Sequence, residues 1–114
     1  MKTLPRKFYA RDTIEVARDL LGKILVFGEK RGQITEVEAY LGVDDPASHA
    51  FGKLTQRKKI FLGPAGISYT FLIYGMHWCF NILAGPKGKM GCVLIQGIND
   101  VFGPGRVTKY FGID

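Results

Sequence analysis

The spacing of apolar residues near the N-terminus predicts a short amphipathic helix over residues 13–21. The apolar positions that recur at helical spacing are Ile14, Ala17, Leu20 and Leu21. Asp12 precedes Glu15 by three residues, as in a capping box, and Gly22 supplies a stop signal after the last apolar position.

The pattern then changes to that of β-strands. Residues 23–27 are β-branched and aromatic, residues 28–32 (GEKRG) have a glycine at each end, and residues 33–41 alternate with period two, which together predict an antiparallel hairpin. On the second strand the alternation predicts one face made of Ile34, Glu36, Glu38 and Tyr40. The other face is predicted to hold Thr35, Val37, Ala39 and Leu41. Two carboxylates are thus expected beside an isoleucine and a tyrosine.

Residues 42–66 show no periodicity and are rich in Gly, Pro, Asp and Lys. A connection of this length is typical of a functional loop rather than a turn. It contains His49 and a basic group made of Lys53, Arg57, Lys58 and Lys59.

Residues 67–83 (ISYTFLIYGMHWCFNIL) are the most strand-like part of the chain and predict a hairpin with its tip near Tyr74, Gly75 and Met76. Residues 92–98 (CVLIQGI) predict another strand, and Pro104 begins a predicted C-terminal helix. At 114 residues the chain is long enough for one modest core, so a single domain over residues 1–114 is expected.

Composition narrows the class of partner. The formal charge of +6 and a pI near 9.5 favour a polyanion such as nucleic acid, without naming it. Cys79 and Cys92 lie in apolar runs without zinc-site spacing, so we expect reduced, buried thiols. No run of about 18 apolar residues is present, and we expect an intracellular protein, cytoplasmic or nuclear, without a membrane partner.

Several residues are candidates for chemistry. Glu38, ahead of a glycine-rich loop, is a candidate general base, although spacing alone favours an ordinary exposed strand residue. His49 is more typical of a loop surface, and no second ligand accompanies it, so a metal site is not expected. Tyr74 at a hairpin tip is a candidate wedge for a DNA minor groove. The basic loop residues are equally consistent with phosphate contacts and with solvated surface.

Five blocks, taken in order, resemble the motifs of the alkyladenine (3-methyladenine) DNA glycosylase family. The blocks are RGQITEVEAYLG, DDPASHA, TQRKKIFLGPAG, YTFLIYGMHWCFNILAGPKG and CVLI. The similarity runs from about the first helix to the C-terminus, and EAYLG and IYGMHWCFN are its most specific parts. The resemblance implies an α+β fold with a curved antiparallel sheet, flanking helices and a protruding hairpin. That hairpin would enter damaged double-stranded DNA while an alkylated purine flips into a pocket.

The resemblance also implies roles for single residues. It implies a monofunctional DNA-3-methyladenine glycosylase of base excision repair, in which Glu38 is the general base and no lysine Schiff base or cofactor takes part. Tyr40, His49 and Phe71 match the walls of the base pocket, Asn81 matches an amide that rejects undamaged guanine, and Tyr74 matches the intercalating residue. The remaining positions implied to contact DNA are Gly75, Met76, Arg57, Lys58 and Gln96.

Three departures from the family pattern qualify these expectations. Phe71 stands where the family usually has tyrosine, a change that activity should tolerate. Gln96 stands where the family has arginine, and this loss of a charged contact predicts weaker binding. The chain also lacks a segment after CVLIQGIND and the family's later strands and helix. Self-association therefore remains open, and so do two alternatives to catalysis, a non-catalytic module that binds distorted nucleic acid and a protein-interaction domain.

Overall fold

A computed structural model describes residues 3–41, 65–66, 68–73, 77–86 and 89–113, and only the backbone of residues 69–73 and 77. The helices are α1 (Arg6–Tyr9), α2 (Thr13–Leu20) and α4 (Pro104–Phe111). The strands are β1 (Ile24–Phe27), β2 (Lys30–Tyr40), β3 (Ser68–Ile73), β4 (His77–Ala84), β5 (Gly91–Ile98) and β6 (Val101–Phe102).

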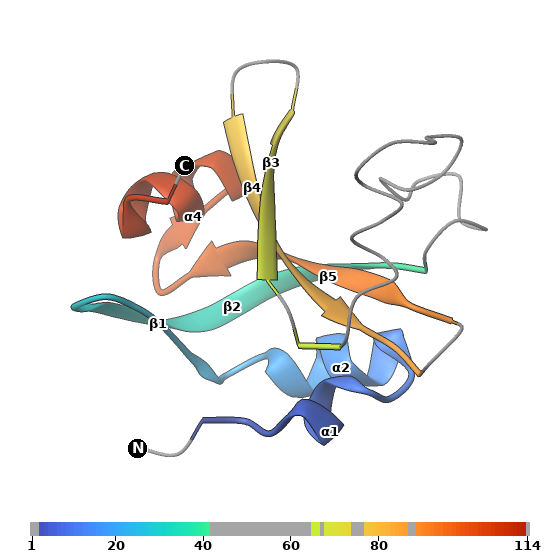
Figure 1. The fold of residues 1–114 in the computed structure, drawn as a ribbon. Helices are drawn as coiled ribbons and strands as arrows, with labels where there is room; N and C mark the ends of the chain where they lie inside the picture. The colour runs from blue at the N-terminus through green and yellow to red at the C-terminus, as the bar shows by residue number, and fades with distance from the viewer. Residues whose placement is uncertain (1–2, 42–64, 67, 74–76, 87–88, 114) are drawn as a thin grey trace.

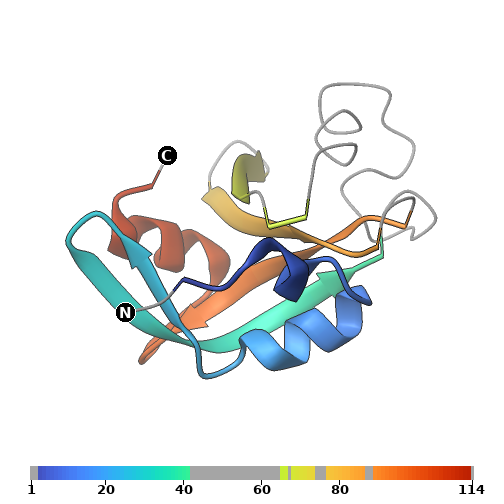
Figure 2. The ribbon, with the colours of Figure 1, turned by 60° about the horizontal axis from the view of Figure 1, so that its bottom comes forward.

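The strands form one antiparallel sheet in the order β1-β2-β5-β4-β3, with β6 paired to β5. The sheet curls strongly, with α2 below β2 and β5 and α4 beside the upper part of β4 (Figures 1 and 2). The predicted α+β fold with a curved sheet and flanking helices is therefore confirmed. Among the described helices, none is long and apolar enough to cross a membrane.

Helix α2 begins where the capping signal predicts. The Asp12 carboxylate accepts a hydrogen bond from the Glu15 backbone N–H at 3.2 Å, and Gly22 follows the helix with φ of +87°. The predicted apolar face is partly wrong, because Ile14 and Leu21 are 42% and 45% exposed. The buried positions of the helix are Thr13, Val16, Ala17 and Leu20. A helix turns about 100° per residue, so Ile14 and Leu21 lie beside this stripe rather than on it.

The first hairpin is tighter than the sequence predicts. Phe27 pairs with Lys30, so only Gly28 and Glu29 form the turn, and β2 starts three residues before the predicted position 33. Gly32 is therefore a strand residue. A Cβ there would lie 2.2 Å from Ile98 Cγ2, so glycine serves close packing rather than the turn.

The predicted faces of β2 are wrong for Ile34. Ile34 is buried in the same core as Val37 and Ala39, although odd and even positions of a regular strand point to opposite faces. The reason is a pair of register shifts, before and after the pairing of Glu36 with Gly97. Each strand gains one extra residue there, so that Glu38 lies on the face opposite the core.

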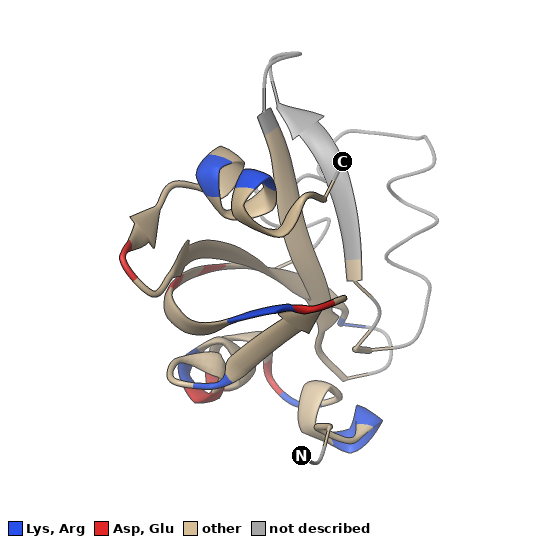
Figure 3. Ribbon diagram, turned by 90° about the vertical axis from the view of Figure 1, so that its left-hand side faces the viewer, with Lys and Arg blue, Asp and Glu red and all other residues tan. Residues whose placement is uncertain are grey.

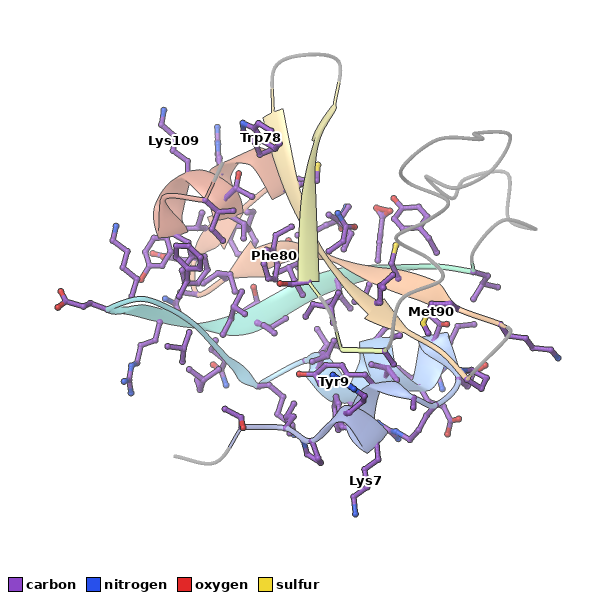
Figure 4. All side chains as sticks on the ribbon, viewed as in Figure 1. Lys7, Tyr9, Trp78, Phe80, Met90 and Lys109 are labelled. Atoms are coloured by element: carbon purple, nitrogen blue, oxygen red, sulfur yellow. The ribbon has the colours of Figure 1, made fainter. Side chains whose placement is uncertain are left out.

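One core joins the sheet to α2 and α4. Its sheet residues are Ile34, Phe80, Ile82, Ala84, Val93, Ile95 and Ile98. Phe80 is 8% exposed and lies within this core, as expected for an inward-facing strand aromatic (Figure 4). Trp78 lies nearer the outer end of β4, where its carbonyl accepts a hydrogen bond of 3.0 Å from Thr108 Oγ1 of α4. Helix α4 thus supports the outer part of β4.

Strands β3 and β4 form the second predicted hairpin, paired from Ser68↔Ile82 to Ile73↔His77. Pairing of β4 with β5 runs from Asn81 to Ala84, whereas its pairing with β3 continues outward to His77. The hairpin therefore extends past β5, as the prediction of a protruding hairpin requires (Figure 1). Its predicted tip, residues 74–76, lies outside the described residues.

Candidate active site

The candidate site is a row of residues across the sheet, on the face opposite the core. Glu38 of β2 pairs with Leu94 of β5, which pairs with Asn81 of β4, which pairs in turn with Tyr69 of β3. Side chains directly opposite each other in antiparallel strands lie close together. The sheet register thus brings Glu38 and Asn81, 43 positions apart in the sequence (81 − 38), into one row.

Both carboxylate oxygens of Glu38 accept hydrogen bonds. The Tyr40 hydroxyl donates to Oε2, and the Gln96 amide donates from Nε2 to Oε1 at 2.6 Å. Tyr40 reaches Glu38 because side chains two residues apart on one strand point to the same face. Gln96 reaches Glu38 because it lies two residues after Leu94, which pairs with Glu38 across the sheet. Glu38 remains exposed. The carboxylate is therefore held in one orientation while open to water.

Tyr40 acts as a hydrogen-bond donor to this carboxylate. Burial raises the pKa of the Tyr40 phenol well above its ordinary value, and the hydrogen bond and negative charge of Glu38 raise that pKa further. The phenol consequently stays protonated across the neutral pH range. Tyr40 is a stable support for Glu38 rather than a base.

Asn81 is fully buried, and its amide is fixed by its neighbours. Its Nδ2 donates to the Cys79 carbonyl at 3.2 Å, and Cys92 Sγ donates to its Oδ1 at 3.9 Å. Both cysteines are free and buried, as the sequence predicts, and burial raises the pKa of the Cys79 thiol. The Cys92 thiol and the Cys79 backbone carbonyl thus hold the Asn81 amide in place.

The other predicted site residues divide into two groups. Phe71 lies on β3 opposite Cys79, which places its backbone at the site, while its side chain is outside the description. Those that lie wholly outside the described residues are His49, Arg57, Lys58, Tyr74, Gly75 and Met76. Their predicted roles stay predictions.

Sequence reasoning missed how Gln96 and Leu94 take part. The resemblance implied a DNA contact for Gln96, which stays a prediction, and the structure adds a hydrogen bond from the Gln96 amide to the Glu38 carboxylate. The strand pattern of β5 was visible in the sequence, but its register with β2 was not. A polar residue inside an otherwise apolar strand was the available signal for a role of Gln96 within the protein.

Charged side chains lie on helices α1, α2 and α4 and on strand β2. Within the described part of the chain, no three His, Cys, Asp or Glu side chains are grouped so as to hold a metal ion. Figure 3 shows Lys and Arg on α4 and on the helices beside the N-terminus. On α4 these are Arg106 and Lys109, both exposed.

Comparison with known proteins points to one family. Residues 7–103 match the family model described as "Methylpurine-DNA glycosylase (MPG)". A "Putative 3-methyladenine DNA glycosylase" of Rickettsia felis is 46% identical over 118 residues, which is 97% of this chain and 67% of the relative. Proteins of the same description from Rickettsia rickettsii (strain Sheila Smith) and Legionella pneumophila (strain Corby) are also 46% identical, with 64% and 68% of their lengths covered. The chain spans about two thirds of the length of these relatives. It belongs to the methylpurine-DNA glycosylase family.

Proposed function

We propose that this protein releases alkylated purines, 3-methyladenine among them, from double-stranded DNA by hydrolysis of the N-glycosidic bond. The observation that carries the proposal is the Glu38 carboxylate, exposed to solvent and oriented by two donors on the face of the sheet opposite the core. Family membership supplies the substrate class, because the matching relatives are described as 3-methyladenine DNA glycosylases.

Glu38 is the general base of the proposed reaction. A water molecule held by its carboxylate attacks the anomeric carbon of the sugar, and the proton of that water passes to Glu38. The bond to the purine breaks with its electron pair going to the base, and the sugar keeps the water oxygen as a hydroxyl. The reaction is monofunctional, since no lysine Schiff base is formed.

The base pocket is proposed to lie along the same row. Tyr40, Phe71 and His49 form its walls, where aromatic faces attract the positive charge of an alkylated purine. Asn81 restricts entry of undamaged guanine through its fixed amide. The support for this arrangement is the pairing of Glu38 and Asn81 across Leu94 and the position of Phe71 opposite Cys79.

Binding to DNA is proposed to use the protruding hairpin. Tyr74 fills the space left by the flipped nucleotide, with Gly75 and Met76 beside it in the minor groove. Arg57 and Lys58 contact phosphates. The net charge of +6 supports a salt-dependent affinity for DNA.

The direct test is release of free base from a duplex containing one alkylated purine, under single-turnover conditions at low salt. We expect the wild-type protein to release the base and Glu38→Gln to slow the release by at least about a hundredfold, the lower end of a general-base contribution. Glu36→Gln is the matched control, because Glu36 is an exposed carboxylate on the same strand outside the site. It should release base at the wild-type rate.

The second candidate is a non-catalytic module that binds distorted nucleic acid, which the positive charge would serve equally well. It predicts lesion-dependent, salt-sensitive binding with no base release from the wild type. Equal release by wild type and Glu38→Gln would contradict the proposed mechanism in a different way, because another group would then be the base.

A further inference from the structure

Helix α4 lies beside the outer part of the protruding hairpin. The Thr108 hydroxyl of α4 donates a hydrogen bond of 3.0 Å to the Trp78 carbonyl, and Trp78 is the second residue of β4. Figures 1 and 3 both show α4 alongside the outer part of this strand. Side chains on the exposed face of α4 are therefore close to whatever the hairpin enters.

The helix is fixed to two strands. Besides its bond to β4, α4 is bonded to the start of β2, where Lys30 Nζ donates to the Tyr110 carbonyl at 2.8 Å. The Tyr110 hydroxyl donates in turn to the Arg31 carbonyl at 3.1 Å. Val107 and Phe111 pack into the main core. The exposed side chains of α4 are thus held in a defined place relative to the hairpin.

Arg106 and Lys109 lie together on the exposed face of α4. The three buried residues of the helix are Val107, Thr108 and Phe111. Since a helix turns about 100° per residue, Arg106 and Lys109 lie about 60° apart on the opposite face. In Figure 4, Lys109 points toward the side of the molecule where Trp78 and the outer end of β4 lie, whereas Lys7 points to the opposite side. The cationic face of α4 therefore looks toward the side on which the hairpin protrudes.

These two charges do not serve the helix itself. Arg106 is the third residue of α4 and lies in its first turn, where the helix dipole disfavours a cation. Arg106 and Lys109 are also three positions apart, a spacing at which like charges on a helix repel each other. A bound anion would relieve both effects. Side chains that conflict with local stability are typical of functional positions.

We propose that Arg106 and Lys109 bind phosphates of the DNA backbone beside the hairpin and so hold the duplex while the hairpin enters its minor groove. This inference rests on the proposed glycosylase function. It adds a DNA-binding surface on α4 to the contacts proposed for the hairpin and for Arg57 and Lys58.

The dimensions of DNA fit this arrangement. The minor groove is about 7.5 Å deep and is bordered by the two sugar-phosphate backbones. Trp78, to which α4 is bonded, lies one strand step, about 3.4 Å, from the outer end of β4 at His77. A hairpin inserted to the floor of the groove therefore brings α4 to its rim, where the phosphates are.

The test measures binding to a duplex with one tetrahydrofuran abasic analogue, which has no glycosidic bond to hydrolyse. Fluorescence anisotropy gives the Kd of the wild type and of the double variant Arg106→Gln with Lys109→Gln, between about 50 and 200 mM salt. Each lost phosphate contact lowers the slope of log Kd against log salt by about 0.9, so the double variant should lose about 1.8. The ratio of its Kd to that of the wild type should then shrink roughly tenfold across this range.

Lys7→Gln with Arg18→Gln is the matched control, because it removes two exposed cations from α1 and α2, at the end of the molecule opposite the hairpin (Figure 1). It should lower the slope by less than about 0.5. Arg106→Lys with Lys109→Arg keeps both charges and should keep the wild-type slope. In thermal unfolding, Arg106→Gln should be at least as stable as the wild type, since it removes an unfavourable charge from the first turn of α4.

The outcomes separate this inference from the proposed function. A slope that is unchanged in the neutral α4 variant, or lowered equally by the control, overturns the inference, and base release by the wild type would still support the glycosylase. A slope lowered equally by the charge-retaining variant overturns the role of charge. A slope lowered only in the neutral α4 variant, without base release by the wild type, supports the DNA-binding surface and removes the proposed catalysis. A wild type that does not bind the duplex removes both.

Discussion

The hydroxyl of Thr13 donates a buried hydrogen bond of 2.8 Å to the Ala84 carbonyl, which joins the first residue of α2 to the last residue of β4. Thr13 is only 3% exposed. Thr13→Val keeps the shape of the side chain but leaves the Ala84 carbonyl without this donor. We expect the free energy of unfolding to fall by about 1–3 kcal/mol, measured by urea denaturation. Thr3→Val, at an exposed position, should change it by less than about 0.5 kcal/mol.

Gly32 tests the packing between β2 and β5. A Cβ at this position would meet Ile98 Cγ2 at 2.2 Å, so Gly32→Ala should destabilise the protein by about 1–3 kcal/mol. Gly28→Ala is the comparison, because its Cβ would meet nothing within 4 Å and only the φ of +61° opposes it. Its cost should be about 1 kcal/mol. A larger loss for Gly28→Ala than for Gly32→Ala in urea denaturation would contradict the packing argument.

Tyr40 should make the free energy of unfolding decrease at high pH. Its pKa is raised in the folded protein, so folding favours the protonated phenol, and this contribution is present below the ordinary pKa of 10.0 and is lost as the pH rises toward the folded value. The unfolding free energy of the wild type should therefore fall more steeply above pH 10 than that of Tyr40→Phe. Tyr9, whose pKa burial also raises, is retained in both proteins and its effect cancels in the comparison. Parallel curves for the two proteins would refute the assignment.

Cys79 and Cys92 should be protected from thiol reagents. Both are buried, and the raised pKa of Cys79 reduces the reactive thiolate further. Modification by an aromatic disulfide reagent at pH 8 should be at least about a hundredfold slower in the native protein than in urea. The absorbance of the released aromatic thiol measures both rates. Rapid labelling of either cysteine without unfolding would contradict this prediction, because it would show that reagents reach the face of the sheet that carries the candidate site.

Much of the local structure could be predicted because it depends on neighbouring residues. Asp12 and Glu15 locate the start of α2, and the apolar run over residues 92–98 identifies β5. The hairpin of β3 and β4 was also predictable, since its strands follow one another. In each case the signal and the structure lie within about twenty residues of each other.

The supports of the candidate site could not be predicted from local patterns. Gln96 and Glu38 are 58 positions apart, and whether they meet depends on the register of β5 with β2. A regular alternation also assigned Ile34 to the face of Glu38, because period two carries no information about where an extra residue interrupts a strand. The family resemblance made Glu38 the candidate base, which stays a prediction, while the hydrogen bonds that orient its carboxylate could be seen only in the structure.

The two register shifts between β2 and β5 cancel, as compensating frameshifts do in a coding sequence. Ile34 pairs with Ile98 and Glu38 with Leu94, so four steps on one strand match four on the other. Ile34 and Val37 are three positions apart, which a regular strand would place on opposite faces, and the extra residue in β2 brings both to the core. The orientation of the Glu38 carboxylate therefore depends more on the number of residues between Ile34 and Glu38 than on their identity, and replacing Thr35 by another small residue should leave that orientation unchanged.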